Sequence, residues 1–331
     1  MATRQGLTAQ SFRLAAEGYR EAVGGSMSPD SLRRITQGWG RAVDQQREAD
    51  CERLELPVES PRERLIAPMD PISEQANLST DGGMVLIRQQ GWKEVKLTTI
   101  SEVKVRPAQE RRAEKGKSSR REQDPWVILG KHSYQAGLWE ADEMARHQLV
   151  EGLRRGLDQS QRLSSVNDGA LWIKRITQAN FPTAVQIIDW RHASDRLWSV
   201  GNAAFGERTP AAKEWVGHQL DSLWDGRVKS VEMALEALSL EGEDQPDELG
   251  QGAGYFKNNR KRMQYDLFRQ KAYPIGSGTV ESGIKTVVHH RMRRPGRGWN
   301  RRNGQDMLAA LSALHSGRFH QAWNASLPCA N

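Results

Sequence analysis

A glycine-broken turn that leads into a helix, residues 273–291, constrains the fold more than any other stretch of the sequence. Gly276 and Gly278 interrupt the preceding element, and either Ser277 or Thr279 is placed to cap the first turn of the helix. The apolar residues that follow recur at helical spacing and predict one buried face, formed by Val280, Ile284, Val287 and Val288. This face requires a core surface on which the helix can pack.

Glu281 begins a second stripe on the same predicted helix. Lys285 and His289 follow it at four-residue intervals, so the three side chains are expected on one side of the helix. A carboxylate in the first turn, with a cation one turn later, suits a metal ion and a phosphate group. The alternative is an ordinary first-turn glutamate that the helix dipole stabilises, and the helix by itself leaves both open.

A basic run without any acidic residue follows this helix and favours an anionic partner. Its cations would offset the repulsion between phosphates, and Trp299 would be able to stack on an unpaired base. The alternative is a solvated basic helix end whose charge complements the dipole. Because the run joins the Glu281 helix directly, we expect it to contact DNA. Its cations are Lys285, Arg291, Arg293, Arg294, Arg297, Arg301 and Arg302.

The composition supports a polyanionic partner and gives no sign of a membrane or a disulfide scaffold. The chain of 331 residues has a formal net charge of +7, which fits a nucleic acid. No apolar run approaches the roughly 18 residues that a membrane-spanning helix needs, and no signal peptide is apparent. Cys51 and Cys329 are isolated, which excludes a zinc ribbon within this chain. We therefore expect a location in the reducing cytoplasm.

Residues 1–47 are predicted to form a helical segment in which two helices meet at a glycine turn. The second helix begins at Pro29, a residue favoured at the first helical position. The pair resembles a helix-turn-helix with Arg33 and Arg34 on its outer face, and a plain helical hairpin is an equal alternative. The inner face is predicted from Leu32, Ile35, Trp39 and Val43. The charged residues 48–75 are expected to be a linker.

The remaining residues, 76–331, are predicted to form one α/β domain. Strands that alternate with helices late in this region imply a mixed sheet with helices on its faces. A charged run over 106–123 is expected to be a surface loop. The first predicted strand runs over 84–87, and a weak alternation from Ala76 through Asp81 leads into it. Further strands are predicted over 93–100, 101–105, 162–167 and 184–188, and helices over 138–157, from 171, and across 193–268.

Three carboxylates occupy marked places in this pattern. Asp81 lies on the first strand, Asp168 lies at the end of the strand over 162–167, and Glu281 lies near the start of the late helix. A mixed sheet can bring the two aspartates together, and the helix can lay its glutamate over them. Such a cluster would bind two Mg²⁺ or Mn²⁺ ions, which favour carboxylate oxygen. Two such ions would activate the attacking oxygen and stabilise the leaving oxygen of an in-line displacement.

Each carboxylate also has a structural alternative. Asp81 with Gly82 has the sequence of a hairpin turn, and Asp168 with Gly169 has the sequence of a turn or a helix cap. Asp189 is an alternative second ligand, because it too follows a buried strand. No protein nucleophile is apparent, since neither cysteine has a neighbouring histidine and no Gly-x-Ser-x-Gly elbow occurs.

Several segments, taken together and in order, resemble a known family. They are Thr80-Asp81-Gly82-Gly83-Met84-Val85, Gly91-Trp92-Lys93-Glu94-Val95-Lys96, Asp168-Gly169-Ala170-x-Trp172-Ile173, Ile188-Asp189-Trp190-x-His192-Ala193, the stretch from Tyr273 to Ser282, and Arg291-Met292-x-Arg294-Pro295-Gly296 with Trp299. Over residues 76–323 the sequence resembles the catalytic domain of ISKra-family insertion-sequence transposases. These enzymes form a bacterial branch near the Mutator-like DDE group.

The resemblance implies an RNase H-like fold with a helical insertion at about 193–273. It implies Mg²⁺-dependent cleavage and joining of double-stranded DNA by a homo-oligomer in the nucleoid of a bacterial cell. Asp81, Asp168 and Glu281 would be the metal-binding triad, and Asp189 and His192 would be supporting residues. A histidine satisfied within the core is the alternative for His192.

The sequence departs from the family in one respect. Members commonly have a longer N-terminal region with a cysteine cluster, which this chain lacks. Two further functions therefore stay open beside transposition. One is a catalytically inactive, transposase-derived DNA-binding protein, and the other is an RNase H-like nuclease that cuts without joining.

Overall fold

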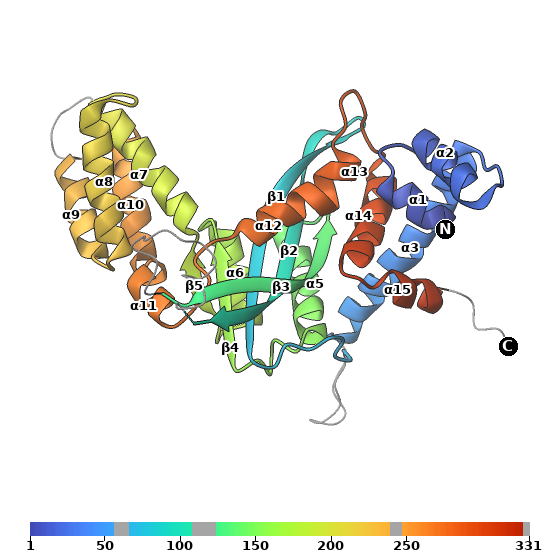
Figure 1. The fold of residues 1–331 in the computed structure, drawn as a ribbon, viewed down its shortest axis with the longest axis horizontal. Coiled ribbons are helices and arrows are strands. Elements are labelled where there is room, and N and C mark those ends of the chain that lie inside the picture. The colour runs from blue at the N-terminus through green and yellow to red at the C-terminus, as the bar shows by residue number, and fades with distance from the viewer. Residues whose placement is uncertain (56–65, 108–123, 239–246, 327–331) are drawn as a thin grey trace.

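A five-stranded mixed sheet forms the centre of the fold (Figure 1). The structure, a computed structural model, describes residues 1–55, 66–107, 124–238 and 247–326. The strands lie in the order β3-β2-β1-β4-β5; β2 is antiparallel to β1 and β3, and β4 is parallel to β1 and β5. Their bounds are Gln75–Ile87 for β1, Gly91–Arg106 for β2, Trp126–Gly137 for β3, Arg162–Asn167 for β4 and Val185–Ile188 for β5. The predicted mixed sheet with helices on its faces is confirmed.

Strand β1 runs without a break through Asp81 and the two glycines that follow it. Asp81 is paired with Leu97 of β2, and Gly82 is paired with Lys96. The alternative in which Asp81 and Gly82 form a hairpin turn is therefore wrong, because both lie inside the ladder.

The first half of β1 is polar although it is buried. The hydroxyl of Thr80 lies 3.1 Å from that of Thr98 across the ladder and accepts a bond from Gln148 Nε2 at 3.1 Å. Asn77 donates to Ser79 Oγ at 3.1 Å. Buried polar groups are tolerated when they are hydrogen-bonded, so these bonds explain how a polar segment can occupy the middle of the sheet.

The antiparallel edge differs from the sequence prediction. Residues 93–105, expected as two strands, belong to the single strand β2, whose pairing with β3 shifts between Ile100 and Glu102. The third strand is instead β3, which the sequence did not indicate. Lys131 has φ 45° within it, and this kink breaks the alternation that would have marked the strand. Of the charged run before β3, residues 108–123 lie outside the described residues.

The helices between the parallel strands were correctly predicted. Helix α5 (Ala141–Arg154) connects β3 to β4, and α6 (Leu171–Asn180) connects β4 to β5. Within the described part of the chain, no helix is long and apolar enough to cross a lipid bilayer.

A helical block follows β5 and stands at the end of the molecule opposite the N-terminus (Figure 1). It has its own apolar core, which includes Leu197, Val216 and Phe256 and continues into Ile188 of β5. The block is thereby anchored on the sheet by one edge strand. Its elements are α7 Trp190–Phe205, α8 Pro210–Trp224, α9 Val228–Leu238, α10 Asp247–Asn259, the 3₁₀ turn η1 Arg260–Arg262, and α11 Tyr265–Gln270.

The N-terminal segment contains three helices: α1 (Ala2–Thr8), α2 (Phe12–Val23) and α3 (Pro29–Arg53). Helix α3 continues into the segment that was expected to be a linker. The predicted burial of Leu32, Trp39 and Val43 is confirmed, whereas that of Ile35 is wrong, because its side chain is 40% exposed. The neighbouring residue Thr36 is buried instead, because it packs against Gly6 of α1.

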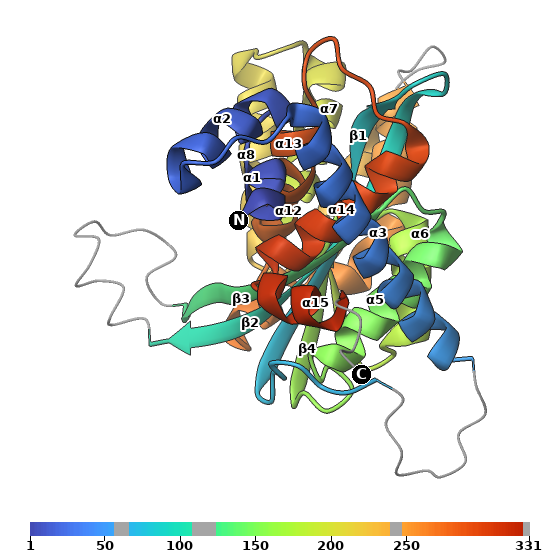
Figure 2. The same ribbon diagram turned by 90° about the vertical axis from the view of Figure 1, so that its right-hand side faces the viewer.

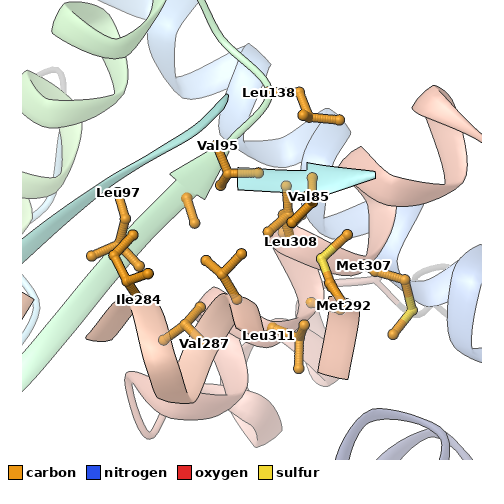
Figure 3. Close-up of a cluster of buried hydrophobic side chains, with 14 of the residues drawn as sticks. Val85, Val95, Leu97, Leu138, Ile284, Val287, Met292, Met307, Leu308 and Leu311 are labelled. Carbon is orange, nitrogen blue, oxygen red and sulfur yellow. The ribbon is translucent and has the colours of Figure 1, made fainter. Parts of the chain in front are cut away.

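The chain returns to the sheet through the predicted Glu281 helix. It consists of α12 (Gly278–Gly283), the π-helical segment η2 (Ile284–His289) and α13 (His290–Met292). The predicted apolar face is buried as expected. Figure 3 shows Ile284 and Val287 facing Leu97 of the sheet, with α14 (Arg301–His315) completing the cluster. Beside α14, α15 (Phe319–Ser326) and the N-terminal helices cover the same side (Figure 2).

Two glycines allow the helix to lie close to the sheet. A Cβ atom on Gly83 of β1 would lie 2.8 Å from Ile284 Cγ2, and one on Gly283 would lie 3.0 Å from Tyr134 Cε1. Both separations are shorter than ordinary carbon–carbon contacts, so neither position accepts a side chain unless its neighbours move. This close packing determines how far Glu281 lies from β1.

Substitution Gly83→Ala is expected to lower the free energy of unfolding by about 1–3 kcal/mol, because the methyl group over-packs this contact. Urea unfolding followed by circular dichroism measures the change. Gly130→Ala is the matched control, since it lies in β3 with nothing within 4 Å of the added atom. Equal stability of the two variants would show that the approach of the helix is not constrained by Gly83.

Candidate functional site

Asp81 and Asp168 are brought together by the junction of two parallel strands. Regular pairing of β1 with β4 ends at Leu78 and Ser165. Beyond it, the side chain of Asn167 continues the ladder, because its Oδ1 accepts the backbone N–H of Thr80 at 2.7 Å. Asp81 directly follows Thr80, and Asp168 directly follows Asn167. The sequence therefore places the two carboxylates at one point of the sheet.

Asp168 is held in a tight turn between β4 and α6. Its Oδ1 accepts the N–H of Ala170 at 2.9 Å, and Gly169 has φ 101°, a backbone conformation that favours glycine. The carbonyl oxygen of Asp168 accepts the hydroxyl of Tyr255 at 3.0 Å, which reaches it from α10. The turn predicted as an alternative is present, and it leaves the carboxylate half-exposed beside Asp81.

Asp189 is buried and has both carboxylate oxygens occupied. Its Oδ1 accepts the backbone N–H of His192 at 2.9 Å and the ring Nδ1–H of His192 at 3.2 Å. Its Oδ2 accepts the N–H of Ser277 at 2.5 Å. Burial alone would raise the pKa of Asp189, but these hydrogen bonds outweigh it and lower the pKa to about 2. The group is a permanently charged acceptor inside the fold.

These bonds attach the segment before the Glu281 helix to the end of β5. The N–H of Trp190 donates to Ile275 O at 2.9 Å, beside the bond from Ser277 to Asp189. Ser277 occupies the N-cap position of α12, but neither its side chain nor that of Thr279 caps the helix, so the predicted cap is wrong. The helix start is fixed by its contact with β5 instead.

The acidic side chains influence one another electrostatically. The pKa of Asp81 is raised by burial and by the negative charges of Asp168 and Glu281, against the opposing effects of the Gly82 N–H and His192. The pKa of His192 is raised by its bond to Asp189 and by the charges of Asp168 and Glu281. Side chains from four separate segments thus interact, with one histidine among the acids.

Glu281 is partly exposed and has a cationic neighbour. Its Oε2 lies 4.0 Å from Nη1 of Arg191, and its side chain is 30% exposed. Both residues line a cavity of about 510 Å³ together with aromatic side chains, including Trp126, Trp190 and Tyr273. The carboxylate is therefore accessible to a ligand that enters between β3 and the helical block.

The carboxylates suit Mg²⁺ or Mn²⁺ by their chemistry, because both ions prefer oxygen ligands. Burial and the charges of Asp168 and Glu281 raise the pKa of Asp81, and a bound cation would relieve both effects. As the side chains lie, no group of three or more acidic, histidine or cysteine residues in the described ranges is close enough to hold a metal ion. The carboxylate oxygens are therefore of the right type for these ions, but the described residues do not form a ready three-ligand site.

Some residues of the predicted basic run are exposed to solvent, and others form bonds within the protein. Lys285, Arg293 and Arg297 are exposed. Arg301 donates to Leu138 O at 2.9 Å, and Arg302 forms ion pairs with Asp44 and Asp306. Arg301 and Arg302 thus attach the start of α14 to Leu138 and to Asp44 of α3.

The remaining predicted contacts lie near the N-terminal helices. Arg291 is buried, Arg294 is half-buried, and the indole of Trp299 donates to Met292 O at 2.9 Å. In α3, Arg33 and Arg34 are both paired with Asp30.

Three residues near the carboxylates were missed from the sequence. They are Arg191 beside Glu281, and Tyr255 and Arg262, which act on Asp168 from the helical block. Only the fold brings them to the site, and no local pattern marks them. The same reason explains the omission of Arg88, which lines a basic pocket with the residues after α13.

The expectation that neither cysteine has a neighbouring histidine is wrong for Cys51. Its Sγ lies 3.4 Å from Nδ1 of His147, whose Nε2 lies 3.2 Å from a carboxylate oxygen of Glu48. The contact spans 96 residues of sequence, so no spacing pattern indicates it. Burial raises the pKa of the thiol to about 11, which keeps it protonated and a poor nucleophile.

A comparison with models of known protein families finds no match, and a search of curated proteins finds no similar sequence. The family resemblance seen in the motifs therefore remains an expectation.

Substitution Asp189→Asn is expected to destabilise the fold by about 2–3 kcal/mol at neutral pH, the equivalent of lowering the pKa from 3.8 to about 2. Because the folded-state pKa is depressed, this stabilisation is complete above pH 4 and is lost as the pH falls toward 2. Urea unfolding at pH 7 and pH 3 should show the difference from wild type shrinking. The control Asp195→Asn, 65% exposed on the next turn of α7, should match wild type at both values. An Asp189→Asn deficit that does not shrink at pH 3 would contradict this role.

Substitution Asp81→Asn is expected to raise the thermal midpoint of the metal-free protein, because the raised pKa marks a carboxylate whose charge opposes folding at pH 7. Mg²⁺ should stabilise the wild-type protein and have little effect on the variant, since a ligand stabilises only the state that binds it. Differential scanning calorimetry in EDTA and in Mg²⁺ measures both effects. A variant that is less stable in EDTA and equally stabilised by Mg²⁺ would exclude Asp81 from a metal site.

Proposed function

We propose that the protein is a DDE-type transposase of a bacterial insertion sequence, which cleaves and joins DNA strands with divalent metal ions. The observation that carries the proposal is the convergence of Asp81, Asp168 and Glu281. These residues come from β1, from the end of β4 and from α12, and the charges of Asp168 and Glu281 help to raise the pKa of Asp81. A cluster of carboxylates that repel one another is a characteristic of functional sites rather than of stable cores.

The arrangement of the sheet supports an RNase H-like fold for residues 76–331. Three antiparallel strands followed by two parallel strands, in the order β3-β2-β1-β4-β5, are expected of that fold. The helical block from α7 to α11 fits the predicted insertion at about 193–273, between the last strand and the glutamate helix. We further propose that the N-terminal helices serve as a helix-turn-helix-like DNA-binding segment.

The three carboxylates would hold two Mg²⁺ or Mn²⁺ ions, which supply Lewis acidity to the attacking and leaving oxygens of a phosphodiester. The structure favours Asp168 over Asp189 as the second ligand, because both oxygens of Asp189 already accept bonds. Asp189 would act as a positioning residue for the Glu281 helix. His192 would keep a positive charge beside the acids and present its second ring nitrogen to a phosphate oxygen.

The charge distribution supports double-stranded DNA as the partner. Arg191 lies beside Glu281, and Lys285 is exposed one turn further along the helix. Exposed cations next to the carboxylates would bind the phosphates of a strand that reaches the site. A homo-oligomer that pairs two transposon ends, in the nucleoid of the cytoplasm, completes the proposal.

One observation favours a second candidate. The absence of a preformed three-ligand metal group in the described part of the chain is what a catalytically inactive, transposase-derived DNA-binding protein would show. A nuclease that cuts without joining has the same site and differs only in the fate of the cut strand.

The proposal predicts Mg²⁺- or Mn²⁺-dependent nicking and joining of oligonucleotides that carry the element's terminal sequences. Asp81→Asn, Asp168→Asn and Glu281→Gln should each reduce both reactions at least about 100-fold, more than the loss of an outer-shell partner costs. Asp195→Asn, a neighbouring exposed aspartate, should leave them unchanged. Gel assays of cleavage and strand transfer measure the effect, with circular dichroism to establish folding.

The outcomes separate the candidates. Full activity of a folded Glu281→Gln protein would reject the DDE mechanism. Cleavage without strand transfer would indicate the nuclease. Salt-sensitive DNA binding that all three substitutions leave intact, without any cleavage by the wild type, would indicate the inactive DNA-binding protein.

A further inference from the structure

A second charged site lies away from the carboxylates, in a pocket of about 440 Å³ between the N-terminal helices and the loop after α13. β1 extends six residues beyond Asp81 to reach this region, a separation of about 20 Å along the strand. Among the described residues, no carboxylate lines the pocket. Five arginines and one tryptophan line it: Arg33, Arg88, Arg291, Arg294, Arg297 and Trp299.

Arg291 is the centre of this pocket and lacks a compensating charge. It is 3% exposed, and its guanidinium lies 4.5 Å from the ring centroid of Phe12 and 5.3 Å from that of Trp299. Its Nε donates to Gly6 O at 3.2 Å, whereas its buried Nη2 has no hydrogen-bond partner among the described residues. A buried cation with an unused donor is costly unless an anion binds it.

The neighbouring arginines increase this excess of charge. Burial, together with the positive charges of Arg297 and Arg294, lowers the pKa of Arg291 to about 10. Nε of Arg294 is also buried without a hydrogen-bond partner in the described chain. Two other lining residues are engaged: Arg33 is paired with Asp30, and Arg88 donates to Gly298 O at 2.8 Å. The uncompensated charge is concentrated on the three arginines after η2.

We propose that this pocket binds a phosphate group through Arg291, Arg294 and Arg297. Planar guanidinium groups match the oxygens of a phosphate with paired hydrogen bonds, and three of them together can bind several of its oxygens at once. The phosphate belongs either to a nucleic acid backbone or to a free phosphorylated molecule. The proposal rests on the DNA contact proposed above and narrows it to this one pocket, where binding needs neither the carboxylates nor a metal ion.

The position of the pocket gives binding a structural consequence. Arg291 joins α13 to α1 through Gly6 and to α2 through Phe12, so the repelling arginines lie at the attachment of the N-terminal helices. Without ligand their repulsion weakens this attachment. A bound phosphate would replace repulsion with attraction and raise the stability of the whole chain.

The test uses the full chain in EDTA, with pyrophosphate and a 20-base-pair duplex as separate ligands. The double variant Arg294→Gln/Arg297→Gln should be at least as thermally stable as wild type without ligand, because it removes two repelling charges. It should bind at least one of the two ligands about ten-fold more weakly. For the duplex, the slope of log Kd against log salt concentration should fall by roughly 2.

Arg13→Gln is the control, because Arg13 lies on α2 beside Phe12, is 79% exposed and does not line the pocket. It should bind both ligands as wild type does. Arg291→Met is informative only if it folds, so the conclusion rests on the double variant.

The two ligands identify the source of the phosphate. If the double variant loses affinity for pyrophosphate, the natural ligand is a free phosphorylated molecule. If it loses affinity only for the duplex, the natural ligand is the nucleic acid backbone. The proposal is overturned if the double variant binds both ligands within two-fold of wild type, or if Arg13→Gln loses as much affinity. Asp81→Asn should retain this binding, so failure of the catalytic proposal and failure of the pocket are distinguishable.

Discussion

The buried carboxylate of Asp189 is the contact on which the arrangement of the site depends. It joins the end of β5 and the first turn of α7 to the backbone at Ser277, which lies 88 residues further along the chain. The helical block leaves the sheet and returns to it at this one place. Without the bond to Ser277, the Glu281 helix would have no fixed start, because the side chain of Ser277 does not cap it. A charged group buried so deeply is tolerated because three hydrogen bonds satisfy it.

The molecule contains two regions in which like charges gather, and the two regions have opposite signs. The charges of Asp168 and Glu281 oppose the ionised form of Asp81 on β1, and the charges of Arg297 and Arg294 oppose that of Arg291 beyond the end of the strand. Both clusters oppose folding, and each would be relieved by a ligand of the opposite charge. One continuous helical segment, α12 to α13, carries residues of both clusters. Divalent cations would bind the carboxylates, and the phosphates of a nucleic acid would bind the arginines.

Local patterns predicted the elements better than their contacts. The buried face of the Glu281 helix and the strands β4 and β5 follow from apolar spacing, and the structure has them. Strand β3 escaped prediction because Lys131 interrupts its alternation. The helical character of residues 1–47 was predicted, but the break between α1 and α2 was not. The sequence proposed the carboxylates, but the neighbours Arg191 and Tyr255 reach them only through the fold. The preference for Asp168 over Asp189 as a proposed ligand likewise rests on the hydrogen bonds of each oxygen, which no sequence pattern shows.

The central claim is that three acidic side chains act together on divalent metal ions. Anomalous diffraction from crystals of the wild-type protein grown with Mn²⁺ and a DNA duplex tests it directly. The account predicts manganese peaks between Asp81 and Asp168 and beside Glu281, with Asp189 still bonded to Ser277. Manganese bound elsewhere, or bound by Asp189 with Glu281 turned away from the aspartates, would contradict it.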